Sequence, residues 1–82
     1  MERDKAIEII HKEGLINFKM FEKRDNKENE VVLLKQSGKW IVYVTDERAS
    51  KITNSVDEYT TESEALDDFI ERLRADKILR EL

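Results

Sequence analysis

Apolar residues first recur along the chain at the spacing of a helix. Ala6, Ile7 and Ile10 share one side of a helix predicted over residues 2–13. Gly14 follows at the position where a left-handed residue commonly ends a helix. The pattern therefore predicts a short amphipathic helix whose apolar side packs against the rest of the fold.

The period then changes to the two-residue repeat of a strand. Ile16, Phe18 and Met20 alternate with polar residues and share one face. The alternation gives way to the polar stretch RDNKENE, which is typical of a loop. A first strand and a solvated connection are therefore expected here.

The clearest element is a hairpin in EVVLLKQSGKWIVYVTD, residues 30–46. A two-residue turn at Ser37-Gly38 pairs Lys35 with Trp40 and Val31 with Val44. One face then carries Val31, Leu33, Trp40, Val42 and Val44, and the other carries Val32, Leu34, Ile41 and Tyr43. Both faces are apolar, which is more than a sheet with one solvated side requires.

The chain returns to helical spacing after a weaker strand in KITNSVDEY, residues 51–59. Thr61 followed three residues later by Glu64 is a capping box, and it predicts a helix over residues 61–75. Its apolar stripe is Leu66, Phe69, Ile70 and Leu73. We therefore expect a single α+β domain over residues 1–82: an N-terminal helix, an antiparallel sheet of three to four strands within residues 15–59, and a C-terminal helix packed on the sheet.

The tail, residues 76–82, does not fit the same stripe. If the helix continued, Ile78, Leu79 and Leu82 would fall on the side that carries Glu64, away from the core. Either the helix breaks near residues 74–77 and the tail packs elsewhere, or the tail contacts another chain.

Composition narrows the classes of function. The chain is 41 % charged and carries a net charge of −4, with a pI of about 5.0. Basic and acidic residues alternate along it, so the basic patch typical of a nucleic-acid binder is missing. The acidity suits a basic protein partner, although solubility alone also explains it.

Membrane and secretory classes are disfavoured as well. No run approaches the ~20 apolar residues that span a bilayer, and MERDKAIEIIHKEG lacks the apolar stretch of a signal peptide. The chain contains no cysteine, so disulfides and thiolate metal sites are excluded. We expect a cytoplasmic protein.

A search for catalytic or metal-binding motifs returns nothing specific. His11 is the only histidine, and no nucleophile is spaced to work with it. The loop DNKENE departs from the calcium-loop pattern, and two glycines cannot build a phosphate-binding loop. We therefore expect no enzymatic activity, no cofactor and no metal.

The remaining candidates are protein contacts. Asp46, Glu47 and Arg48 end the apolar hairpin strand abruptly, and they form either a solvated turn or part of a docking edge. Asp57 and Glu58 on the next strand extend the same hypothesis.

Two aromatic residues form a second candidate contact. Trp40 and Tyr43 belong to the residue types that dominate binding hot spots. Trp40 is also a natural core residue and a partner for a cation–π contact with Lys35.

The run GKWIVYVTDERASKI, followed by DEYTTESEALDDFIERLR, resembles small immunity proteins of bacterial polymorphic-toxin systems. The likeness covers roughly residues 28–74: a hairpin strand that ends in Asp46-Glu47-Arg48, a short further strand, and an amphipathic helix. It implies a cytosolic protein that binds and neutralises a cognate toxin domain. It identifies neither the toxin nor the residues that bind it.

One alternative comes from a different class. The chain is then a homo-oligomeric structural or regulatory module, paired through Ile78, Leu79 and Leu82 or through the second sheet face. Light scattering separates the two hypotheses, because a monomer at all concentrations contradicts the second.

Overall fold

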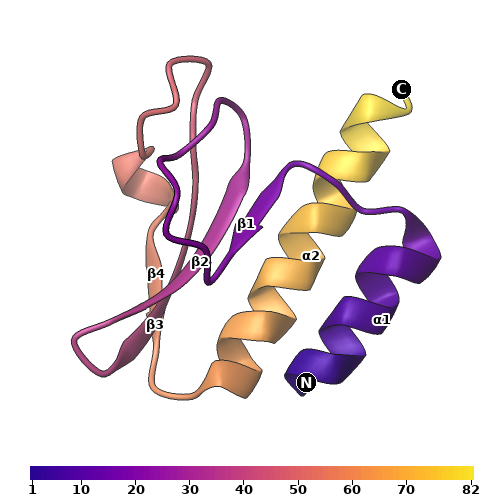
Figure 1. The fold of residues 1–82 in the computed structure, drawn as a ribbon. Helices are drawn as coiled ribbons and strands as arrows, with labels where there is room; N and C mark the ends of the chain where they lie inside the picture. The colour runs from indigo at the N-terminus through magenta and orange to yellow at the C-terminus, as the bar shows by residue number, and fades with distance from the viewer.

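The structure is a computed structural model that describes residues 1–82, and it has two layers (Figure 1). Two helices cover one face of a four-stranded sheet. The elements are α1 (Arg3–Glu13), β1 (Phe18–Met20), β2 (Val31–Gln36), β3 (Lys39–Val44), a short 3₁₀ turn η1 (Thr53–Ser55), β4 (Asp57–Tyr59) and α2 (Glu62–Arg80). The predicted α+β class is confirmed.

The hairpin has the predicted register. Lys35 pairs with Trp40 and Val31 pairs with Val44. Ser37 and Gly38 both have positive φ, 52° and 78°, as a two-residue turn of this twist requires. The strands lie in the order β1-β2-β3-β4, so each neighbours the next one along the chain.

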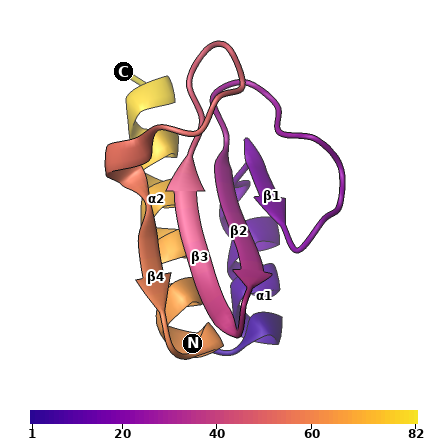
Figure 2. The ribbon, with the colours of Figure 1, turned by 90° about the vertical axis from the view of Figure 1, so that its left-hand side faces the viewer.

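The sheet is mixed, and the expectation of a wholly antiparallel sheet was wrong at one edge. β1 pairs with β2 in parallel, with Phe18 opposite Val31 and Met20 opposite Leu33. The connection over residues 21–30 carries the chain back along the sheet before β2 starts (Figure 2). A repeat of two residues predicts a strand but not its direction, because side chains alternate in both kinds of ladder.

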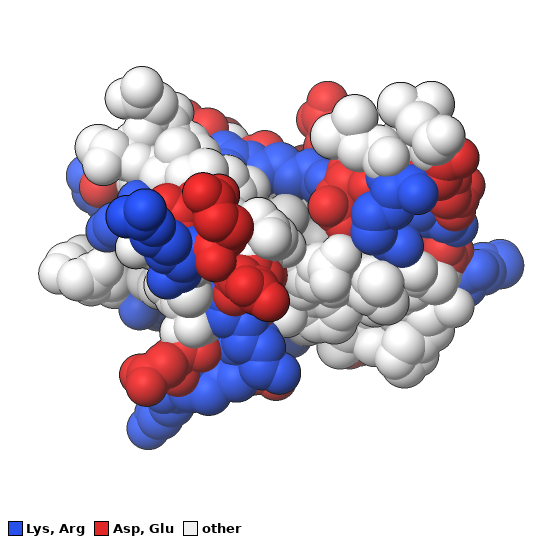
Figure 3. Space-filling model, turned by 90° about the horizontal axis from the view of Figure 1, so that it is seen from above, with Lys and Arg blue, Asp and Glu red and all other residues white.

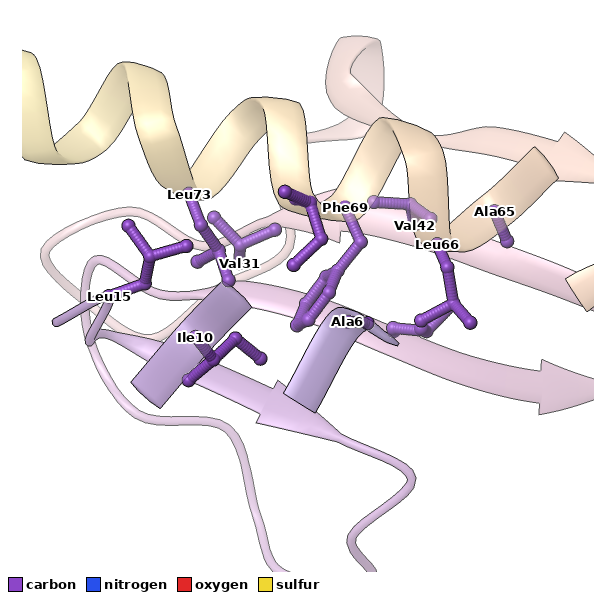
Figure 4. Packing of buried hydrophobic residues seen from close by; sticks show 11 residues of the cluster. Ala6, Ile10, Leu15, Val31, Val42, Ala65, Leu66, Phe69 and Leu73 are labelled. Carbon is purple, nitrogen blue, oxygen red and sulfur yellow. The ribbon is translucent and has the colours of Figure 1, made fainter. Parts of the chain in front are cut away.

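The core lies between the helices and the sheet. Phe69 of α2 is fully buried and reaches toward Ile10 and Ala6 of α1 (Figure 4). Its ring meets that of Phe18 edge to face, with centroids 6.0 Å apart. The buried cluster comprises Ala6, Ile10, Leu15, Val31, Leu33, Val42, Ala65, Leu66, Phe69, Ile70 and Leu73. The apolar stripes predicted for both helices therefore meet in one place.

The second apolar face of the sheet has its own cover. The connection over residues 21–30 lies on the side of the sheet away from the helices (Figure 1). Asn26 exchanges hydrogen bonds with the Tyr43 hydroxyl at 3.0 and 3.2 Å, and Val32 is fully buried. Half of this face is thus protected within the chain, while Leu34 and Ile41 stay partly exposed.

The last helix is longer than expected and does not break. It begins after Thr61, whose Oγ1 accepts a hydrogen bond from the Glu64 N–H, and it continues to Arg80 rather than ending near residue 75. Contacts with the end of α1 support the extension: Arg74 pairs with Glu13, and the Lys77 ammonium donates to the Glu13 carbonyl. The helix therefore does not break near residues 74–77 and points the tail away from the core, while a contact of the tail with another chain stays a prediction.

Candidate functional site

The second half of α2 leans away from the sheet (Figure 1), and a groove lined by residues of both lies at this end of the molecule. It has a volume of about 330 Å³, near the lower end of the ~300–1,000 Å³ usual for ligand pockets. Its apolar walls are Val31 and Val44 from the sheet and Ala75 and Leu79 from α2. Polar residues complete the lining: Asn29, Glu30, Thr45, Arg72 and Asp76.

The surface around the groove has mixed charge. Figure 3 looks down on this end of the molecule and shows basic and acidic side chains lying next to each other, with uncharged surface on both the sheet side and the helix side. This end therefore has no field of one sign that would attract a nucleic acid.

Arg72 is fully engaged at the groove wall. Its Nε donates to Asp68 at 3.0 Å, its Nη1 to the Ser55 carbonyl at 2.8 Å, and its Nη2 to Asp57 at 2.7 Å. Because each guanidinium nitrogen already donates, Arg72 ties α2 to β4 and is not a free cation for an anionic ligand.

Asp76, on the same wall, is occupied in a similar way. Its Oδ2 accepts from Asn17 at 3.2 Å and from Arg80 at 3.0 Å. The groove therefore offers apolar walls beside an arginine and a carboxylate that already pair within the chain. That lining suits an inserted apolar side chain better than a charged ligand.

The charged stretch after β3 forms a turn at the sheet side of this end. Asp46 Oδ1 accepts hydrogen bonds from the backbone N–H groups of Arg48 and Ser50, at 2.8 and 3.0 Å. Glu47 and Arg48 are exposed, and neither makes an ion pair. Asp46 thus shapes the turn, while Glu47 and Arg48 are free to contact a partner.

Asp57 and Glu58 sit on the edge strand β4 and point to opposite faces. Asp57 lies opposite Val42 and pairs with Arg72 on the helix side. Glu58 lies opposite Ile41 and is 3.6 Å from the Lys39 ammonium on the other side. The structure therefore does not bring these two acids together with the turn at Asp46.

The two aromatic candidates are also apart. Trp40 packs against the core on the helix side, with the Lys35 ammonium 4.7 Å from its ring centroid. Tyr43 faces the other way and is buried beneath the connection over residues 21–30. Tyr43 is largely closed to a partner, and Trp40 is partly so.

Sequence reasoning missed the groove but carried a signal for it. Val44 was placed on its strand and Leu79 in the tail after the predicted helix, but their position on one groove depends on the angle between α2 and the sheet. The signal was the change of face along the last helix, which left Leu79 without a partner inside the domain.

Shifted pKa values in the structure have local structural causes. The hydrogen bond from the Tyr59 hydroxyl to Asp68, 2.6 Å long, is the main reason that the pKa of Tyr59 rises to about 12. The hydrogen bond from Arg74 lowers the pKa of Glu13. Both shifts therefore follow from hydrogen bonds that join α2 to a neighbouring element, β4 for Tyr59 and α1 for Glu13.

The structure shows neither a metal-ligand cluster nor a helix that could span a membrane. No group of three or more His, Cys, Asp or Glu side chains is placed to hold a metal ion. Neither helix combines the length and the apolar composition needed to cross a bilayer.

The structure is a small α+β scaffold with a surface groove, and its sequence resembles small immunity proteins. A family model described as Immunity protein 59 matches residues 2–81. The chain therefore belongs to the Immunity protein 59 family. The match confirms that resemblance and extends it beyond residues 28–74, to α1 and to the end of α2. No curated protein and no solved structure matches the chain.

Proposed function

We propose that the protein neutralises a cognate bacterial toxin by binding it directly, without catalysing a reaction. The observation that carries this proposal is the family match over residues 2–81. Binding by occlusion needs a stable scaffold and a complementary surface, and it needs no active centre.

We also propose where the protein acts and in which kind of system. The protein acts in the bacterial cytoplasm as the immunity component of a polymorphic-toxin system. A net charge of −4 favours a basic toxin domain, because opposite charge raises the rate of association at low salt.

The turn after β3 supplies one set of proposed contacts. Glu47 and Arg48 are exposed and without ion pairs, and Asp46 holds the turn that presents them. Asp57 and Glu58 already pair with Arg72 and Lys39, so they contribute to a toxin contact only through their second oxygens.

The test takes the protein encoded next to this gene as the candidate toxin domain. It is expressed with and without this chain, and the purified pair is titrated by calorimetry. Cells are expected to survive only when the chain is present, and the pair is expected to bind. A chain with Phe69→Asp, which cannot keep its core, serves as the unfolded control. Growth arrest despite the folded chain, together with no heat of binding at micromolar concentrations, contradicts the proposal.

A second candidate function is self-association as a structural or regulatory module. The observation in its favour is the exposure of Ile78, Leu79 and Leu82, at 63, 70 and 95 %. Sedimentation over a hundredfold range of concentration decides it, since a monomer throughout contradicts this function.

A further inference from the structure

The residues on the solvent-facing side of α2 change from acidic to apolar halfway along the helix. Helical spacing of three and four residues aligns its outer positions into one stripe. The first half of the stripe is acidic: Glu64, Asp67, Asp68 and Glu71. The second half is apolar: Ala75, Ile78, Leu79 and Leu82, all exposed. Because α2 runs unbroken to Arg80, both halves lie along one straight surface.

The acidic half keeps an excess of negative charge. Residues 57–71 contain seven acids and no lysine or arginine. Five of these acids already have a cation: Arg72 pairs with Asp57 and Asp68, Arg3 with Glu62, Lys39 with Glu58, and the Met1 ammonium with Asp67. Glu71, next to the apolar half, is exposed and makes no ion pair. A basic group that approaches the middle of α2 therefore finds an unpaired carboxylate.

The apolar half continues directly into the groove. Ala75 and Leu79 belong both to the stripe and to the groove wall, opposite Val44 and Val31 of the sheet. An apolar side chain of a partner that lies along Ile78 and Leu79 can therefore enter the groove, which has a volume of about 330 Å³. Burial of this kind, at roughly 25 cal/mol per Å² of apolar surface, is the usual source of affinity at the centre of an interface.

A second copy of the chain fits this surface poorly. Parallel pairing of two α2 helices sets Glu71 and its acidic neighbours against their own copies. Antiparallel pairing over the full helix buries those carboxylates against Ile78 and Leu79, without cations to pair them. If only the apolar ends overlap, each copy contributes about two helical turns to the contact. The surface buried is then well below the ~1,200 Å² that specific interfaces bury.

We propose that this surface, the α2 stripe with its groove, is the toxin-binding face, and that the toxin presents an exposed apolar side chain beside a lysine or arginine. The apolar side chain enters the groove between Leu79 and Val44, and the cation pairs with Glu71. This inference rests on the proposed function and names the partner chemistry for it.

The test measures binding of the inactivated toxin domain encoded beside this gene to four variants of the full chain. Leu79→Glu is expected to weaken binding at least 30-fold, and Glu71→Lys about 5- to 10-fold at low salt with a smaller loss at high salt. The matched controls are Ile7→Glu, at another exposed isoleucine, and Glu8→Lys, at another exposed helical acid, and both are expected to bind as the parent does. Circular dichroism and melting temperature confirm that each variant is folded.

The possible outcomes separate this inference from the proposed function. If the parent binds and folded Leu79→Glu binds equally well, this inference is wrong while the proposed function stands. If the parent neither binds nor protects, the proposed function fails and the inference fails with it. If the parent is a dimer that Leu79→Glu dissociates, a second copy covers the stripe and the inference is overturned.

Discussion

The carboxylate of Glu30 is almost completely buried, with 3 % of the residue exposed to solvent. Arg24 donates two hydrogen bonds to it, at 2.8 and 3.2 Å, and the Lys27 N–H donates a third at 2.7 Å. Burial raises the pKa of Glu30, but the bonds from Arg24 and Lys27 outweigh burial and leave the pKa below its ordinary value. One ion pair thus fastens the connection over residues 21–30 to the sheet.

Replacing the cation of this pair is therefore expected to be costly. Arg24→Met keeps most of the stem and leaves a buried carboxylate without its partner. We expect a loss of about 2–3 kcal/mol of unfolding free energy at pH 7, less than the ~3–5 kcal/mol of a fully buried pair because the Arg24 side chain is 30 % exposed. Urea denaturation measures it.

The effect of pH on this loss has a definite sign. Because the folded-state pKa of Glu30 is lowered, its contribution to stability is present above the unfolded pKa of about 4.3 and disappears as pH falls through the folded pKa. The difference between parent and Arg24→Met should shrink from pH 7 to pH 3. An equal difference at both pH values contradicts the ion-pair explanation.

The pKa of Tyr59 is shifted in the opposite direction from that of Glu30. Its hydroxyl donates to Asp68, and its pKa rises to about 12. A raised folded-state pKa gives stability that is complete below the unfolded pKa of about 10 and is lost as pH rises toward 12. Ultraviolet titration at 295 nm should show one tyrosine ionising near pH 12, and this step should be absent in Tyr59→Phe. A Tyr59 step near pH 10 in the folded protein contradicts the contact.

At the scale of the element, α2 shows where a helix draws its stability. Its start depends on the N-cap Thr61, whose Oγ1 accepts from the Glu64 N–H at 3.2 Å and donates to the Glu64 carboxylate at 2.9 Å. Thr61→Ala is expected to cost about 1 kcal/mol of unfolding free energy. Thr60→Ala, one residue earlier and exposed, is the control and should change stability by less than ~0.5 kcal/mol. Chemical denaturation of both variants tests the cap.

The two halves of α2 should respond differently to the same change. Leu73 is fully buried and Leu79 is 70 % exposed, although both lie on one continuous helix. Leu73→Ala should cost roughly 2–5 kcal/mol, because it removes packed methyl groups and leaves a cavity. Leu79→Ala should cost less than ~0.5 kcal/mol. Similar losses at both positions would mean that the end of α2 packs against the domain.

At the scale of the whole molecule, local patterns predicted most of the elements, and long-range geometry decided the rest. The hairpin register followed from the Ser37-Gly38 turn, because a two-residue turn allows one pairing. The parallel pairing of Phe18 with Val31 did not follow, since it depends on the path of the chain between them. The cover over Tyr43 was hidden for the same reason, because polar residues 24–26 look solvated in sequence.

The candidate site was likewise predictable only where its residues are neighbours in the sequence. The turn at Asp46 was recognised because its residues are contiguous. The groove was not, because Val44 and Leu79 are far apart in the chain and meet only through the tilt of α2. Asp57 stays a predicted contact, and its pairing with Arg72 was not predicted because that contact spans two elements.

The position of Trp40 provides a built-in optical reporter, since it is the only tryptophan in the chain. It lies at the start of β3, packed on the core beside Lys35, whereas Val44 and the groove lie at the end of that strand. A tryptophan-free toxin bound in the groove should leave the emission maximum unchanged, while unfolding should shift it to the red. A shift on binding, with the fold intact, would place the contact at the hairpin end instead. The intrinsic fluorescence of the unlabelled protein can therefore locate its partner.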